Sequence, residues 1–240
     1  MKTLLFTIAY GPLIKDCAAI TVPLMQAYAE RIGADFKVID TLSVFPVHQA
    51  WQVRGVCGKR ASWEKLRMGE FLETYDRAIF IDADAVIRED CPSLFDIVPE
   101  DSFAGYNEVP WHPTDIMVDR IKRIADFYGL VPPLHDGTQY LNSGVLVASK
   151  IHRDVFKVPK LEYKTPLHEQ DYINLQLLYK KIKVFRLPWQ YHCLVTDGWG
   201  PKEAAPKEQA FIRHYASGLG CGKDLAFIKA DLETCVPHSS

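Results

Sequence analysis

The fold of this chain is decided by the stretch Arg77-Ala-Ile-Phe-Ile-Asp-Ala-Asp-Ala-Val-Ile87. Its short apolar run is typical of a strand buried inside an α/β sheet, and such sheets bind ligands at the carboxyl ends of their strands. The run ends at Asp82-Ala83-Asp84, and residues two apart in an extended chain point to the same face. We therefore expect two carboxylates side by side at the mouth of a crevice. Their mutual repulsion is offset most simply by Mg²⁺ or Mn²⁺, ions that often complete their shell with substrate phosphates.

The segments around this stretch alternate between strand and helix patterns, which predicts an α/β fold. The first two strands and the helix between them form a β-α-β unit, the architecture of a nucleotide-binding half. We find no repeat or linker, and we expect residues 1–240 to form a single domain with a mostly parallel central sheet flanked by helices. The expected strands are 2–8, 36–39, 79–84, 102–106, 141–149 and 184–187. The expected helices are 18–32, 63–75 (N-capped by Ser62), 115–128, 169–179 and 225–232, and the segments 48–59 and 214–223 are expected to be loops.

Length and composition exclude several classes of protein. The 240 residues are enough for one large α/β domain with a full core. A net charge of −2 gives no basic excess that would favour nucleic acid as a partner. No apolar run is long enough to span a bilayer, and the opening segment is too short for a cleaved signal peptide. The six cysteines show no zinc-site spacing, so we expect reduced thiols and a cytoplasmic location, with peripheral membrane association left open.

Six motifs occur between residues 3 and 223 in an order that resembles one enzyme family. They are Ser62-Trp-Glu-Lys-Leu-Arg-Met-Gly-Glu-Phe71, Tyr75-Asp-Arg77, Phe80-Ile-Asp-Ala-Asp-Ala-Val86, Tyr140-Leu-Asn-Ser-Gly-Val-Leu146, Glu169-Gln-Asp171 with Asn174, and His214-Tyr215. The chain resembles the glycosyltransferases of family 8, the glycogenin-like and lipooligosaccharide galactosyltransferase-like group with the GT-A fold. It has a weaker similarity to family 34.

The resemblance implies a site for a metal ion and a nucleotide sugar. Asp82, Asp84 and His214 would bind Mn²⁺ or Mg²⁺, and the ion would hold the diphosphate of a sugar donor that is most often UDP-linked. Neutral imidazole suits such an ion, although most histidines in proteins bind no metal. Lys65 would reach the donor phosphate or sugar, unless it is simply an exposed helical lysine.

Further positions are implied around the nucleotide and its phosphates. Tyr10 follows the first strand and would stack on the base, whereas Asp40 follows the second and would contact base or ribose. Lys223 belongs to the glycine-rich segment after His214, where backbone amides could cradle phosphate. Any of Gly218, Gly220 or Gly222 could be the family's glycine in this segment. Lys223 lies nine residues after His214, farther than the family spacing, so its role stays open.

The donor sugar is expected beside the start of one strand and the head of one helix. The resemblance implies that Asn142, Glu169 and Gln170 surround the transferred sugar and carry out catalysis. Glu169 stands where the family usually has aspartate. An acidic first helical turn also suits the helix dipole, which is the structural alternative for this carboxylate.

The resulting hypothesis is a metal-dependent glycosyltransferase that moves a sugar from a UDP-sugar to a hydroxyl acceptor with retention of configuration. The acceptor would be a glycan, a lipid-linked glycan or a protein. One alternative is a haloacid-dehalogenase-like phosphohydrolase, but the later Gly-Asp-x-x-x-Asp that this class requires is absent. A nucleotidyltransferase would usually carry a glycine-rich signature after the first strand. A sugar-nucleotide-binding module without turnover is the non-enzymatic alternative.

Overall fold

The computed structural model describes residues 1–12, 14–45, 61–109, 112–165, 167–195, 207–216 and 221–234, the side chains of 221–224 and 233–234 excepted. Within these residues the main sheet has six strands in the order β2-β1-β3-β6-β5-β7. These strands are β1 (Thr3–Ile8), β2 (Asp35–Ile39), β3 (Arg77–Ile81), β5 (Phe103–Asn107), β6 (Leu141–Ser149) and β7 (Val184–Arg186). Strands β1, β2 and β3 are mutually parallel, β6 runs antiparallel to both β3 and β5, and β7 is parallel to β5. The predicted mixed, mostly parallel sheet is confirmed.

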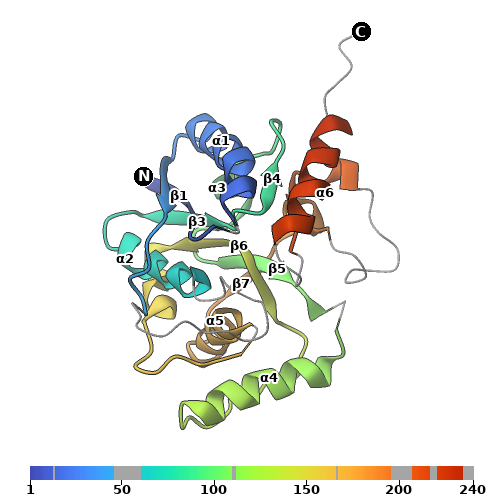
Figure 1. Cartoon of the computed structure of the whole chain (residues 1–240). Helices are drawn as coiled ribbons and strands as arrows, with labels where there is room; N and C mark the ends of the chain where they lie inside the picture. Colours follow the sequence, from blue (N-terminus) through green and yellow to red (C-terminus); the bar gives the residue numbers. More distant parts are fainter. Residues whose placement is uncertain are drawn as a thin grey trace.

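Helices cover both faces of this sheet (Figure 1). One face carries α1 (Lys15–Arg31) and α3 (Leu94–Ile97), and the other carries α2 (Met68–Phe71), α5 (His168–Tyr179) and, farther out, α4 (Thr114–Phe127). The side chains of each strand alternate between two cores. On β1, Leu4 and Phe6 belong to the core under α2, α5 and α4, and Leu5 belongs to the core under α1 and α3. A fully buried strand with apolar residues on both faces is what a sheet covered on both sides requires.

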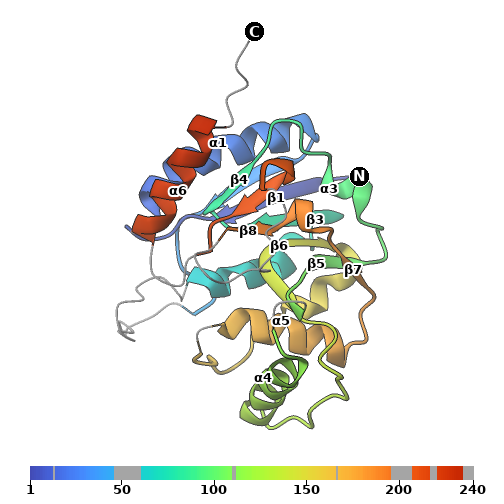
Figure 2. The ribbon, with the colours of Figure 1, turned by 90° about the vertical axis from the view of Figure 1, so that its right-hand side faces the viewer.

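A smaller, three-stranded sheet lies beside the main one and has the order β4-β9-β8. Its strands are β4 (Ala85–Ile87), β8 (Cys193–Leu194) and β9 (Ile212–His214). Helix α6 (Cys221–Thr234) lies alongside α1 (Figure 2), and a small apolar cluster joins Cys17, Val86, Tyr215 and Ile228. The last segments of the chain are thereby held against the first helix and the strand that follows Asp84.

Three local predictions were wrong. The helix expected over 63–75 is a 3-10 helix, η1 (Ala61–Arg67), followed by the short helix α2, and Ser62 lies inside η1. The hydroxyl of Ser62 lies 2.7 Å from Nε2 of His168. The loop expected over 214–223 ends in the first turn of α6, and the small sheet and α3 were not foreseen. The strands of the small sheet have only two or three residues each, and no pattern in the sequence distinguished them from loops.

Three further short 3-10 helices lie within the described residues. They are η3 (Lys150–Phe156), η4 (Trp189–Tyr191) and η5 (Lys207–Gln209). Among the described residues no helix is both long enough and apolar enough to cross a membrane.

Candidate active site

The two aspartates of the deciding stretch lie in a tight turn that joins β3 to β4. Sequence reasoning expected an extended chain here, but Ala85 N–H donates to the carbonyl of Asp82 at 3.0 Å and closes a turn at residues 83–84. Asp82 N–H donates to Gly144 O on β6, and the Thr21 hydroxyl of α1 donates to Ala83 O at 2.6 Å. The turn is therefore fixed from two neighbouring elements. The two carboxylates converge because of the turn, with a quarter or less of each side chain exposed.

The third member of the cluster arrives through strand pairing in the small sheet. Strand β9 pairs antiparallel with β4 so that His214 lies opposite Ala85, the neighbour of Asp84. Its Nε2 lies 3.2 Å from Oδ1 of Asp84 and 3.6 Å from Oδ2 of Asp82. One candidate ligand atom from each of the three residues lies within 4.8 Å of the other two. The predicted set Asp82, Asp84 and His214 is brought together, and its two carboxylates and one imidazole suit Mn²⁺ or Mg²⁺.

A glycine on β6 makes room for the imidazole. A Cβ built on Gly144 would lie 2.3 Å from Cε1 and 2.5 Å from Nδ1 of His214. No side chain fits at such a distance, so His214 packs directly on the backbone of β6. The requirement for glycine in the Asn142-Ser143-Gly144 motif is steric and concerns His214.

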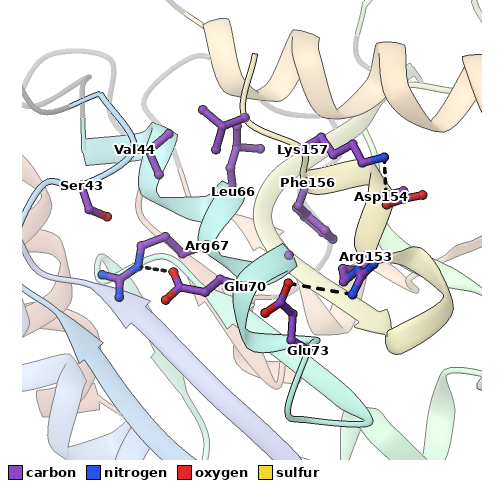
Figure 3. A pocket seen from close by; sticks show the side chains of 12 residues that line it. Ser43, Val44, Leu66, Arg67, Glu70, Glu73, Arg153, Asp154, Phe156 and Lys157 are labelled. Carbon is purple, nitrogen blue, oxygen red and sulfur yellow. Dashed lines mark hydrogen bonds and ion pairs between the residues drawn. The ribbon is translucent and has the colours of Figure 1, made fainter. Parts of the chain in front are cut away.

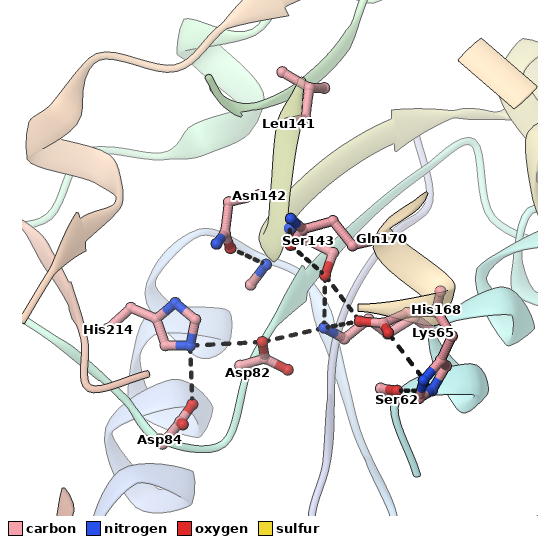
Figure 4. A network of polar contacts seen from close by, with 12 residues as sticks. Ser62, Lys65, Asp82, Asp84, Leu141, Asn142, Ser143, His168, Gln170 and His214 are labelled. Carbon is pink, nitrogen blue, oxygen red and sulfur yellow. Dashed lines mark hydrogen bonds and ion pairs between the residues drawn. The ribbon is translucent and has the colours of Figure 1, made fainter. Parts of the chain in front are cut away.

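Lys65 connects the aspartates to the helix α5. Its side chain is only 4% exposed, so the alternative of an exposed helical lysine is excluded. Its ammonium donates to Asp82 Oδ2 at 3.1 Å, to Ser143 Oγ at 3.0 Å and to Glu169 Oε1 at 3.1 Å. All three ammonium donors are thus engaged. Figure 4 shows this network, which runs from Asp84 through His214 and Asp82 to Lys65. From Lys65 it continues to Ser143 and Glu169, and the carboxylate of Glu169 leads on to His168 and Ser62.

The three residues expected around the donor sugar, Asn142, Glu169 and Gln170, lie together, and a residue that sequence analysis missed holds two of them. Glu108, immediately after β5, accepts from Asn142 Nδ2 at 2.5 Å and from Gln170 Nε2 at 2.9 Å. Because Glu108 holds both amide nitrogens, the amide oxygens point toward the backbone of β6. Gln170 Oε1 accepts from Ser143 N–H at 3.0 Å, and Asn142 Oδ1 accepts from Gly144 N–H at 2.7 Å. Glu108 therefore fixes the orientation of both amides. A lone glutamate after a strand gave no signal in the sequence.

The acidic side chains of the site differ in pKa, because burial and charged neighbours act on each of them differently. Burial raises the pKa of Asp82 to about 6, against the attraction of Lys65 and His214. Burial alone would also raise the pKa of Asp84, but the adjacent His214 lowers it below its ordinary value. Burial opposes ionisation of Glu169 as well, yet Lys65 and His168 bring its pKa down to about 2. Glu169 is thus an anion at neutral pH, as its ion pair with Lys65 requires.

The positions expected to contact the nucleotide lie at the same edge of the sheet. Because β1, β2 and β3 are parallel and Ile8 pairs with Ile39, Tyr10 and Asp40 follow adjacent strand ends beside Asp82. Both side chains are exposed. Gly218 lies outside the described residues. Lys223 lies in the first turn of α6 instead of a loop, and its side chain is among those not described.

The described cavities lie away from this cluster. One of about 520 Å³ lies beside η1, α2 and η3, where Arg67, Glu70, Glu73 and Arg153 line it (Figure 3). Its charged groups are paired with one another, as in the Arg67–Glu70 contact at 3.4 Å. Convergent ligands and perturbed acids mark a functional site better than volume does, so the Asp82–Asp84–His214 cluster is the candidate active site.

The chain is similar in sequence to two plant galactinol synthases. Galactinol synthase 2 of Solanum lycopersicum is 27% identical over 191 residues, covering 72% of this chain and 52% of that protein. Galactinol synthase 2 of Ajuga reptans is 26% identical over 170 residues, covering 65% of this chain and 55% of that protein. The chain therefore spans about half the length of the curated relatives it matches.

Solved structures share the fold. A glycosyltransferase involved in the glycosylation of the major capsid of PBCV-1 gives a TM-score of 0.61 at 12% identity, covering 96% of this chain and all of that one. The galactosyltransferase LgtC, solved in complex with donor and acceptor sugar analogs, gives 0.54 at 13% identity and covers 98% of both chains. At these identities the similarity establishes the fold, which is that of the GT-A glycosyltransferases.

The sequence profile of the family "Glycosyl transferase family 8" matches residues 35–223, well over half of the chain. This match covers the turn that carries Asp82 and Asp84, the β6 motif, the head of α5 and His214. It favours a glycosyltransferase over the phosphohydrolase alternative. On this evidence the chain belongs to glycosyltransferase family 8.

Proposed function

We propose that this glycosyltransferase depends on a divalent cation, Mn²⁺ or Mg²⁺, and takes its sugar from a UDP-sugar. The observation that carries the proposal is the convergence of Asp82, Asp84 and His214, whose ligand atoms lie within 4.8 Å of one another. Two carboxylates and an imidazole are a donor set that accepts either ion, and Mn²⁺ tolerates the nitrogen ligand better. When bound, the ion would neutralise charge that develops on the leaving diphosphate.

The protein's own groups prepare the site for the donor. Lys65 holds Asp82 on one side and Glu169 on the other, so the metal cluster and the donor-sugar residues are fixed relative to each other. Glu108 orients the amides of Asn142 and Gln170 before any substrate arrives. Such preorganisation places hydrogen-bonding groups without reorganisation during the reaction, which is a major source of transition-state stabilisation.

We propose the contacts to the donor's base from the positions of two residues at the strand ends, and the donor's sugar from similarity to other family members. Tyr10 and Asp40 lie at the strand ends next to Asp82, where a base and ribose would extend from a metal-bound diphosphate. Gly218 and Lys223 remain proposed phosphate contacts. The solved relative LgtC is a galactosyltransferase, so UDP-galactose is the first donor to test. Retention of configuration is proposed from family resemblance.

The acceptor is proposed only as a class: a hydroxyl of a glycan, a lipid-linked glycan or a protein. We also propose that residues 1–240 form one domain, because the small sheet and α6 pack on the main sheet's first helix. The cytoplasmic location stays a prediction.

The first experiment measures UDP affinity by calorimetry with Mn²⁺ and with chelator. We expect much tighter binding with Mn²⁺, and we expect this gain to vanish in Asp84→Asn, which is nearly isosteric. Asp126→Asn is the matched control, because Asp126 is an exposed acid on α4 paired with Lys122. Equal UDP affinity with and without metal in the wild type would refute the metal site.

The second experiment separates transfer from phosphate hydrolysis. A panel of nucleotide sugars headed by UDP-galactose is assayed for slow release of free sugar and UDP, since water can replace a missing acceptor. Glu169→Ala should lower this turnover strongly and leave UDP affinity nearly constant, the pattern of contacts made in the transition state. A covalent phosphate on Asp82, or rapid hydrolysis of an aryl phosphate, would instead establish a phosphohydrolase.

A further inference from the structure

A second histidine, His192, lies directly behind the metal-cluster histidine. It follows η4 and immediately precedes β8, which pairs in parallel with β9 so that Leu194 lies opposite His214. Its Nε2 lies 2.9 Å from Nδ1 of His214, and the two ring centroids are 5.0 Å apart. His192 is fully buried, with no exposed surface. It belongs to no motif that the sequence analysis singled out.

The hydrogen bond between the two rings has a consequence for the protons they carry. Nε2 of His214 faces the two aspartates, so a cation held there would use the Nε2 lone pair. A neutral imidazole has one N–H, and its proton must then be on Nδ1. The only acceptor that this structure places at Nδ1 among the described residues is Nε2 of His192. Accepting that bond requires His192 to carry its own proton on Nδ1.

If the two histidines only filled space in the core, the way they are placed would be energetically unfavourable. Nδ1 of His192 is buried and has no hydrogen-bond partner among the described residues. An apolar side chain at this position would avoid leaving a buried polar atom without a partner. The imidazole of His192 provides a hydrogen-bond acceptor directed at His214. Residues that hydrogen-bond to a metal-binding histidine in this way fix its tautomer and its ring orientation.

We propose that His192 is a positioning residue that holds His214 in the Nδ1–H tautomer and in the orientation that presents Nε2 to a divalent cation. This inference rests on the proposed function, since it requires that Asp82, Asp84 and His214 bind a cation. Gly144 limits the ring from the β6 side, and His192 completes its alignment from β8. His192 contacts the ligand and not the ion, so its effect reaches the reaction through metal affinity.

The test compares two substitutions of similar size. His192→Gln keeps an acceptor near the position of Nε2, whereas His192→Leu removes it and keeps the bulk. Mn²⁺ affinity is measured in the presence of saturating UDP, by calorimetry and by the electron paramagnetic resonance of free Mn²⁺. We expect His192→Leu to weaken Mn²⁺ binding by about 10–100-fold and His192→Gln to restore most of it. The Leu substitution should have no further effect on Mn²⁺ affinity in a His214→Ala background.

The outcomes distinguish the inference from the function on which it rests. If wild-type protein binds no Mn²⁺, the proposed metal site itself is wrong. If the wild type binds Mn²⁺ and His192→Leu binds it equally well, the positioning role is refuted and the metal site stands. Equal weakening in the Leu and Gln variants would indicate general disruption of packing and would also refute the role.

A measurement on the wild type keeps the inference testable if the Leu variant does not fold. Two-bond ¹H–¹⁵N correlation spectra of the imidazoles distinguish the two tautomers of His214 in protein loaded with Mg²⁺ and UDP. We expect a protonated Nδ1 and an unprotonated Nε2. A proton on Nε2 of His192 would show that this ring does not accept from His214, and it would overturn the proposal. A proton on Nε2 of His214 in the loaded protein would instead refute the metal site.

Discussion

Substituting Gly144 by alanine is predicted to remove His214 from the metal cluster. The built Cβ lies 2.3 Å from Cε1 and 2.5 Å from Nδ1 of the imidazole, and ordinary contact begins near 3.4 Å. The ring must therefore retreat by about 1 Å. Metal–ligand distances tolerate deviations of only about 0.2 Å, so a ring displaced by this much cannot serve as a ligand while Asp82 and Asp84 keep their places.

Mutating a residue that only hydrogen-bonds to a metal ligand typically weakens metal binding about 10–100-fold. Gly144→Ala displaces the ligand itself, so we expect at least this loss of Mn²⁺ affinity, approaching the effect of His214→Ala. Calorimetric titration of Mn²⁺ at saturating UDP measures it. The structure supplies a sharper comparison in the double variant. With the imidazole removed, the two closest contacts of the new methyl group are gone and the next nearest atom is Asn142 Oδ1, at 3.0 Å, so Gly144→Ala should add little to His214→Ala.

Gly105→Ala is the matched control on the same sheet. Its Cβ would meet the ends of Leu141 and Leu146 at 3.1–3.3 Å, which tightens the core without touching His214. It should lower stability and leave Mn²⁺ affinity unchanged. The steric reasoning would fail if Gly144→Ala bound Mn²⁺ as the wild type does, or if the effects of Gly144→Ala and His214→Ala on the binding free energy were additive.

Two further substitutions test the network around the cluster. Lys65→Met should lower the free energy of unfolding by about 3–5 kcal/mol at pH 7, because it leaves buried carboxylates without their cation. Wild-type Glu169 has a depressed pKa of about 2 against an ordinary 4.5, so its stabilising contribution is lost as pH falls through that window. The difference in the free energy of unfolding between wild type and Lys65→Met, measured by urea unfolding, should therefore shrink as the pH falls through this range. A difference that does not change with pH would contradict the ion pair. Glu108→Ala should reduce turnover on the order of 10²-fold by releasing two amides, with Mn²⁺–UDP affinity unchanged; a matching loss of UDP affinity would contradict a role confined to the donor sugar.

The sequence by itself predicted the strands of the main sheet and the edge of the sheet where the candidate site lies. An apolar run ending in Asp82-Ala83-Asp84 reads as a buried strand because apolar residues on both faces are stable only under two helical layers. Parallel strands place their carboxyl ends at one edge, so Tyr10, Asp40 and Asp82 could be assigned to a common edge without coordinates. Periodicity is local information, and it was sufficient for the long helices and the six main strands.

The tertiary structure alone decided which distant residues meet. His214 reaches Asp84 through the register of β4 and β9, strands of only three residues, and no local pattern encodes a pairing between segments so far apart in the chain. The aspartates converge through a turn that Gly144 and Thr21 fix from other elements, and not through an extended chain. Glu108 and His192 have no signature of their own, because a buried polar residue acquires its role only from the partner that packing places within hydrogen-bonding distance.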